Sequence, residues 1–121
     1  MILRDDVDDE FLTNLVVNSA ALEGTHDARL IRGVSVTKKS SEDEVDFVSR
    51  YFAPWNGIPE DPVNGSSHTN LTPYWSTRLG KTALTAKMLS KRTGVLRLEA
   101  SGDFTGIGGN AIIVNEGNTL V

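Results

Sequence analysis

Two adjacent carboxylates, Glu60 and Asp61, are followed after three residues by Gly65-Ser66-Ser67. The later three residues are typical of the start of a helix, where the first backbone N–H groups have no partner within the helix. A carboxylate beside a cluster of such donors can move a proton on a small anionic ligand while the donors bind its charge. The spacing therefore predicts a site, or half of one, for a small organic acid.

The segment before these carboxylates alternates in the manner of a β-strand. One face of the segment carries Val45, Phe47, Ser49 and Tyr51. The pattern predicts a strand over 45–52, then a loop punctuated by Gly and Pro, then a helix over 66–79 that ends at Gly80. Pro73 lies inside this helix, so the helix either kinks there or restarts with Thr72 as its N-cap.

The rest of the chain predicts short elements with short connections. We expect the end of a strand at 1–3, a helix over 11–22, and strands over 30–36, 83–89, 95–100, 104–107 and 111–114. The charged residues 38–44 contain no apolar side chain and indicate a solvated hairpin loop. This order predicts an α+β domain in which a mainly antiparallel curved sheet wraps around a central helix.

Size and composition narrow the function. A chain of 121 residues predicts a single domain over 1–121. A net charge of −4 with no basic stripe argues against a nucleic-acid partner, and no apolar run approaches the roughly 20 residues of a membrane span. The chain has no cysteine and only two histidines, so we predict no metal and no thiol chemistry. We expect a cytoplasmic protein.

Each candidate residue also has an ordinary structural explanation. Asp61 could begin an Asp-Pro turn, and Ser66 could be a plain N-cap worth about 1 kcal/mol to the helix. We interpret Glu60 as a support for the loop through solvent or a basic neighbour. We interpret His68 as a hydrogen-bonded structural residue, because a lone histidine has that role more often than a catalytic one.

Three aromatic residues and one glycine pair are also interpreted from their places in the predicted elements. Tyr74 and Trp75 recur at helical spacing with apolar neighbours, so we predict that they are core residues. Trp55 lies in a loop, where a large aromatic side chain is less easily explained as a core residue. Gly108-Gly109 is interpreted as a bend between strands, since neither a Walker Lys-Ser/Thr nor a helix follows it.

An ordered series of segments resembles the phenazine-biosynthesis-like (PhzF-like) isomerase family, and its eukaryotic members look most similar. The segments are Ser49–Pro54, Asp61–His68, Pro73-Tyr74-Trp75, Leu79-Gly80-Lys81, Ser90–Gly94, Gly108–Ala111 and Glu116-Gly117. They span nearly the whole chain, and the series is more specific than any one of its members.

The resemblance implies a two-part protein of the diaminopimelate-epimerase type, with a cofactor-independent active site between two similar halves. The implied activity is a proton-shifting isomerisation of a small cyclic carboxylic acid. The family's aspartate and serine fall on Asp61 and Ser66, which would face the ligand, with Asn64, Gly65 and Ser67 beside them. Asn64 stands where threonine is common in the family, an exchange that we expect to be tolerated.

The chain resembles only the second half of the family, and the half that carries the family's general acid/base glutamate has no counterpart in it. We therefore expect the C-terminal domain of an isomerase, inactive by itself, with no cofactor. The alternative is a non-catalytic module that binds another protein or forms a homodimer through the face that would meet the first half.

Overall fold

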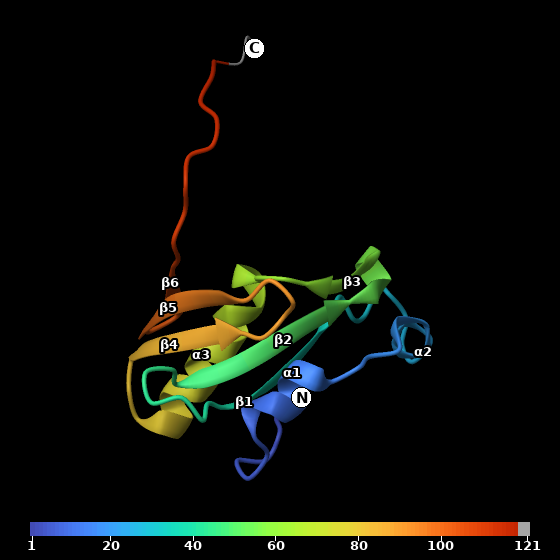
Figure 1. Cartoon of the computed structure of the whole chain (residues 1–121), viewed down its shortest axis with the longest axis horizontal. Helices are drawn as coiled ribbons and strands as arrows, with labels where there is room; N and C mark the ends of the chain where they lie inside the picture. Colours follow the sequence, from blue (N-terminus) through green and yellow to red (C-terminus); the bar gives the residue numbers. More distant parts are fainter. Residues whose placement is uncertain (119–121) are drawn as a thin grey trace.

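A six-stranded sheet is the centre of the molecule, and the computed structural model describes residues 1–118 of the chain (Figure 1). Its main path runs β1-β2-β4-β5-β6, and β3 pairs with β2 beside that path. The strands are β1 Val34–Lys39, β2 Phe47–Ala53, β3 Ile58–Asp61, β4 Ala83–Met88, β5 Gly94–Ser101 and β6 Phe104–Gly108. All pairs are antiparallel except β2–β4, which is parallel. The predicted α+β architecture is confirmed.

Helices cover the two faces of the sheet. The long helix α3 (Gly65–Leu79) packs on one face, and the short helix α1 (Asp9–Asn14) packs on the other (Figure 1). The core on the α3 side consists of Phe47, Trp75, Leu84, Ala86, Met88, Leu96 and Leu98. Trp75 is fully buried, stacks on Phe47 and donates its indole N–H to Thr37 Oγ1 at 3.1 Å. Trp75 is therefore a core residue, as predicted, and Tyr74 packs against the same cluster.

Helix α3 ends where the sequence predicts but begins at a different cap. Its N-cap is Asn64, whose side-chain oxygen accepts from Ser67 N at 2.6 Å, and its C-cap is Gly80, with φ of 68°. The helix runs without interruption through Pro73, and the Thr72 hydroxyl bonds back to the His68 carbonyl at 2.6 Å. Thr72 is therefore not the N-cap of a second helix.

The predicted helix over 11–22 is wrong in extent, because two short helices occupy this region. They are α1 (Asp9–Asn14) and α2 (Ser19–Glu23), capped by Asp8 and Asn18 respectively. Arg50 explains the break, since its guanidinium donates to the carbonyls of Leu12 and Leu15 at 3.0 and 2.7 Å at the end of α1. The extended residues in between place Leu15 against the sheet.

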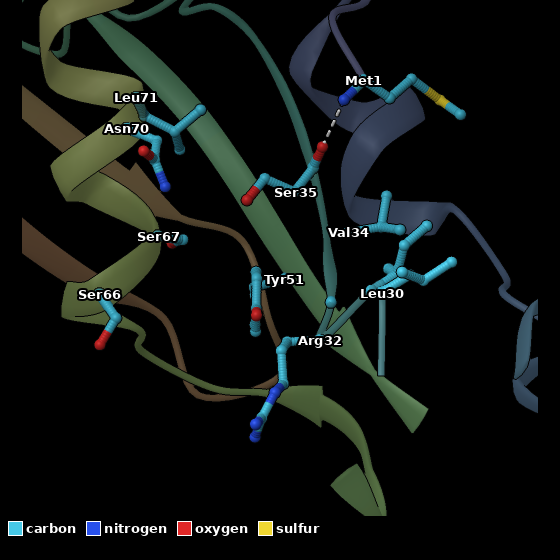
Figure 2. A pocket seen from close by; sticks show the side chains of 12 residues that line it. Met1, Leu30, Arg32, Val34, Ser35, Tyr51, Ser66, Ser67, Asn70 and Leu71 are labelled. Atoms are coloured by element: carbon cyan, nitrogen blue, oxygen red, sulfur yellow. Dashed lines mark hydrogen bonds between the residues drawn. The ribbon is translucent and has the colours of Figure 1, made fainter. Parts of the chain in front are cut away.

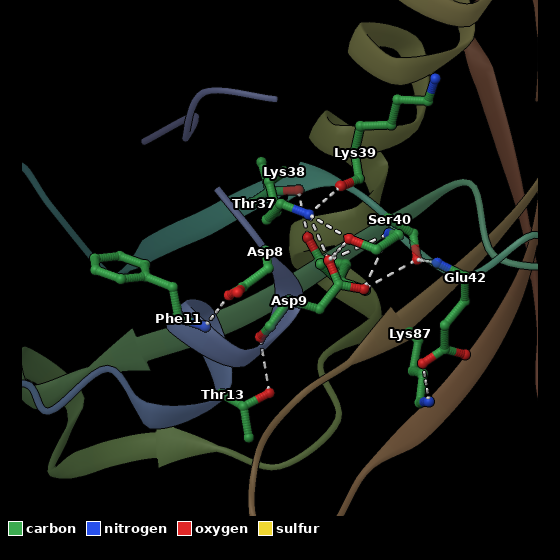
Figure 3. Close-up of polar contacts among 12 residues, drawn as sticks. Asp8, Asp9, Phe11, Thr13, Thr37, Lys38, Lys39, Ser40, Glu42 and Lys87 are labelled. Carbon is green, nitrogen blue, oxygen red and sulfur yellow. Dashed lines mark hydrogen bonds and ion pairs between the residues drawn. The ribbon is translucent and has the colours of Figure 1, made fainter. Parts of the chain in front are cut away.

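The predicted solvated loop over 38–44 is also wrong at its start. Strand β1 continues to Lys39, and the Lys38 side chain is only 1% exposed. Its Nζ forms an ion pair with Asp9 on α1, while the hydroxyl of Ser40 and the backbone N–H of Ser41 also donate to Asp9 (Figure 3). Lys38 therefore fastens the β1–β2 hairpin to α1, whereas residues 41–44 are exposed, as predicted.

Three smaller differences concern strand boundaries. The strand predicted over 30–36 begins only at Val34, and the loop predicted after β2 contains the short strand β3. Residues 111–114 do not form the predicted strand and lie exposed. The expected strand end at 1–3 is present as a parallel bridge between Ile2 and Thr37.

Candidate functional site

Asp61 lies at the end of β3, where the chain turns into α3. Its Oδ2 accepts from Asn64 Nδ2 at 2.8 Å, and its Oδ1 accepts from the Val63 N–H at 3.2 Å. The second bond is the Asx-type turn expected of aspartate before proline. The first ties the carboxylate to the N-cap of the helix. The turn interpretation of Asp61 is therefore confirmed, and its role with a ligand stays a prediction. Asp61 is half-buried.

Asn64 takes the capping role that sequence reasoning offered to Ser66. Because Asn64 Oδ1 already binds the Ser67 N–H, the uncommitted amides at the helix start are those of Gly65 and Ser66. The exposed Ser66 hydroxyl donates to no group within residues 1–118. Ser66 is therefore available to a ligand, whereas the Ser67 N–H is occupied.

A cavity of about 600 Å³ opens beside the first turn of α3. Helix α3 contributes Ser66, Ser67, Asn70 and Leu71 to its wall, and the segment 30–35 with Tyr51 of β2 forms the other side (Figure 2). Asp61 does not line this cavity directly. It is the cross-strand partner of Tyr51, and paired residues project from the same face of a sheet. The structure therefore brings Ser66 and Ser67 into the cavity and places Asp61 next to its Tyr51 wall.

Glu60 points to the opposite face of β3 from Asp61, as alternation along a strand requires. Arg50 holds it with two hydrogen bonds, Nε to Oε1 at 2.6 Å and Nη2 to Oε2 at 2.9 Å. The same guanidinium caps α1. The interpretation of Glu60 as a support bound to a basic neighbour is confirmed.

His68 is a buried structural residue, as predicted. Its Nδ1 donates to the Asn64 carbonyl at 2.7 Å, its Nε2 lies 3.5 Å from Ser49 Oγ, and its ring stacks on Phe47. Burial lowers the pKa of His68, and the hydrogen bond to the Asn64 carbonyl offsets this only in part. The imidazole is therefore neutral near pH 7 and stabilises the start of α3 through its hydrogen bond to the Asn64 carbonyl.

The lining residues that sequence reasoning missed include Tyr51, Gly33 and Arg32. The alternation of β2 predicted that Tyr51 shares a face with Phe47, and both residues pack in the core on the α3 side of the sheet. Its role at the cavity depends on the pairing of β2 with β3, a strand that the sequence did not reveal. Trp55, in contrast, donates its indole N–H within the chain, to the carbonyls of Glu23 and His26 at 3.0 and 3.1 Å.

Two classes of feature are absent from the part of the chain that the structure describes. Residues 1–118 contain no group of three or more acidic or histidine side chains that could hold a metal ion. Among the same residues, no helix has the length and apolar character needed to cross a membrane. The predicted cytoplasmic location stays a prediction.

Comparison with known proteins places this geometry in a family. A family model described as phenazine biosynthesis-like protein matches residues 8–117. A phenazine biosynthesis-like domain-containing protein of Rattus norvegicus is 42% identical over 120 residues, which cover 95% of this chain and 42% of that protein. An uncharacterized isomerase of Pseudomonas aeruginosa is 44% identical over 112 residues, covering 92% and 41% respectively.

Solved structures agree with the sequence comparison. A PhzC/PhzF protein of Clostridium difficile superposes with a TM-score of 0.80 at 35% identity, over 100% of this chain and 44% of that one. The chain therefore belongs to the phenazine biosynthesis-like (PhzF) family and shares its diaminopimelate-epimerase-like fold. It spans less than half the length of these relatives.

Proposed function

We propose that this chain supplies one wall of the active site of a cofactor-independent isomerase that acts on a small carboxylic acid by proton transfer. The carrying observation is that Asn64 ties the Asp61 carboxylate to the start of α3, the same turn that carries the uncommitted Ser66 hydroxyl. The name isomerase among the Pseudomonas relatives supports the reaction class.

The residues would divide the work by chemistry. The amides of Gly65 and Ser66 and the Ser66 hydroxyl would bind the ligand's carboxylate, because a helix start favours negative charge. Asp61 would hold or relay a proton at the neighbouring carbon. Asn64 would keep Asp61 in place while its other side-chain atom caps the helix.

The 121-residue chain by itself should not turn over substrate. Moving a proton between positions of a bound acid needs a donor and an acceptor around the ligand, and this chain provides one acidic group beside an open cavity. We infer that the chain is a single domain equivalent to the C-terminal half of its relatives, and that the other half supplies the second group. A deuterium-washout assay on the isolated chain tests this inference, since solvent exchange into a candidate acid would contradict it.

Binding can be tested separately from turnover. In a ¹H–¹⁵N spectrum, benzoate should shift the amide signals of Gly65 and Ser66, and Ser66→Ala should weaken binding severalfold. Ser101→Ala is the matched control, because Ser101 is an exposed serine at the end of β5. No response at the helix start with benzoate, or equal effects of both variants, would refute the proposed ligand site.

A second candidate is a non-catalytic module that dimerises. It is supported by apolar side chains exposed on and after β6, namely Phe104 (80% exposed), Ile107, Ile112, Ile113 and Val114. Within residues 1–118 no strand pairs with the outer edge of β6, and such edges and patches are typical of interfaces. Sedimentation decides between the candidates: a tight homodimer that Phe104→Ser disrupts favours the second, and a monomer at high concentration excludes it.

A further inference from the structure

Tyr51 of β2 lines the cavity between the segment 30–35 and α3. It lies on the α3 face of β2, opposite Asp61 in the register, and lines the same cavity as Ser66 and Asn70 (Figure 2). Its ring packs against the core cluster that contains Phe47 and Trp75, so the base of the side chain is held by packing. Its hydroxyl makes no hydrogen bond to any group of residues 1–118.

Gly33 provides the space in which this ring lies. A Cβ at position 33 would come within 2.2 Å of the Tyr51 hydroxyl oxygen and 2.3 Å of Cζ. Any side chain at position 33 would therefore move the phenol away from its present position. The absence of a side chain at Gly33 therefore leaves the space that the Tyr51 phenol occupies.

The charge around the cavity suits an anion. Arg32 lines the cavity, is exposed, and forms no ion pair within the described residues. The start of α3 lies on the other side of the cavity and adds the positive end of a helix dipole. The volume of about 600 Å³ admits a ring-sized molecule.

We propose that Tyr51 is a ligand-binding residue of this site, whose hydroxyl donates a hydrogen bond to the carboxylate of a small cyclic acid held between α3 and Gly33. This rests on the proposed function, because it assigns Tyr51 to the same ligand as Ser66. Tyr51 binds the acid from the β2 side, Ser66 binds it from the helix side, and Arg32 compensates its charge at the rim.

The experiment uses the fact that the chain contains only two tyrosines, Tyr51 and Tyr74. Protein labelled with ¹³Cζ-tyrosine gives two signals, and benzoate should shift only that of Tyr51. Tyr51→Phe, which removes one hydroxyl, should weaken benzoate binding about tenfold or more, the usual effect of a hydrogen bond to a charged group. Tyr74→Phe is the matched control, because the Tyr74 hydroxyl accepts from Arg78 on the exposed side of α3.

Two further measurements separate a specific contact from general damage. Gly33→Ala keeps every polar group but displaces the phenol, and should weaken benzoate binding to a similar extent. Benzyl alcohol, a probe of similar size without charge, should bind the wild type and Tyr51→Phe equally weakly.

Each outcome decides between the two proposals. Benzoate binding that depends on Ser66 but not on Tyr51 overturns the role of Tyr51 and leaves the proposed function intact. A response that depends on Tyr51 without any change at the Gly65 and Ser66 amides keeps Tyr51 as a ligand contact and removes the isomerase site. Absence of binding in the millimolar range overturns both.

Discussion

Arg50 connects three parts of the molecule, and replacing it by methionine tests how firmly the site is mounted. Its guanidinium makes two hydrogen bonds to Glu60 on β3 and donates to the last carbonyls of α1. The side chain is about nine-tenths buried, while that of Glu60 is 22% exposed. Arg50→Met preserves most of the apolar stem but leaves the Glu60 carboxylate and the α1 carbonyls without their donor.

The magnitude follows from this burial. Removing one partner of a buried ion pair costs about 3–5 kcal/mol, because the other charge remains desolvated. Glu60 can regain some water, so we expect the lower end, about 3 kcal/mol. This is a large fraction of the roughly 5–15 kcal/mol by which small domains are stable. The double variant Arg50→Met/Glu60→Gln should recover about 1 kcal/mol or more, since the orphaned charge is gone.

The assay is urea unfolding followed by circular dichroism, with Lys87→Met as the matched control. Lys87 pairs with Glu42 at 2.6 Å, but Glu42 is half exposed, so its loss should cost at most about 1 kcal/mol. The inference that Arg50 holds β3 and α1 together would be refuted if Arg50→Met cost no more than Lys87→Met. It would also be refuted if the double variant were no more stable than Arg50→Met. Shifts of the Asp61 and Asn64 amide signals in Arg50→Met would show that β3 has moved the site.

Three more predictions concern residues around this frame. Burial would raise the pKa of Asp9, but hydrogen bonds from Lys38 and Ser41 together with the Lys38 charge lower it. The contribution of Asp9 to stability is therefore complete above the ordinary pKa of 3.8 and is lost as the pH falls below that value. Asp9→Asn should flatten that part of an acid-unfolding curve. Burial lowers the pKa of His68, so the unfolded chain takes up that proton first as the pH drops. Stability should therefore fall as the pH drops below 6.5, and His68→Gln should remove this slope. Gly94→Ala would place a Cβ 2.5 Å from Val63 Cγ2, so it should destabilise the turn before α3 by about 1–3 kcal/mol in urea unfolding, and adding Val63→Ala should restore most of the loss.

Strong local signals predicted the elements that carry the site. Alternation specified β2, and Gly80 in the left-handed region specified the end of α3. The helix was predicted to begin at Ser66, one residue after its first residue in the structure, because Asn64 and not serine provides the cap. These features are encoded by neighbours in the chain, so they are readable without knowledge of the tertiary structure.

The features that sequence reasoning missed depend on partners far apart in the chain. Lys38 is buried where Asp9, on α1, reaches its ammonium group. Strand β3 is short and contains Pro59, so it has little strand character of its own and forms by pairing with β2. The cavity contacts of Tyr51 follow from that pairing and from the absence of a side chain at Gly33.

Asn64 shows why the site must be understood as a unit. Its Nδ2 donates to Asp61, its Oδ1 accepts from the Ser67 N–H, and its carbonyl accepts from His68 Nδ1. Threonine at this position could cap a helix but has no amide to offer an aspartate. Replacing Asn64 by threonine would therefore keep a helix cap but leave Asp61 with only the Val63 N–H as a donor. Residue 64 thus determines the freedom of the Asp61 carboxylate more than it determines the stability of α3.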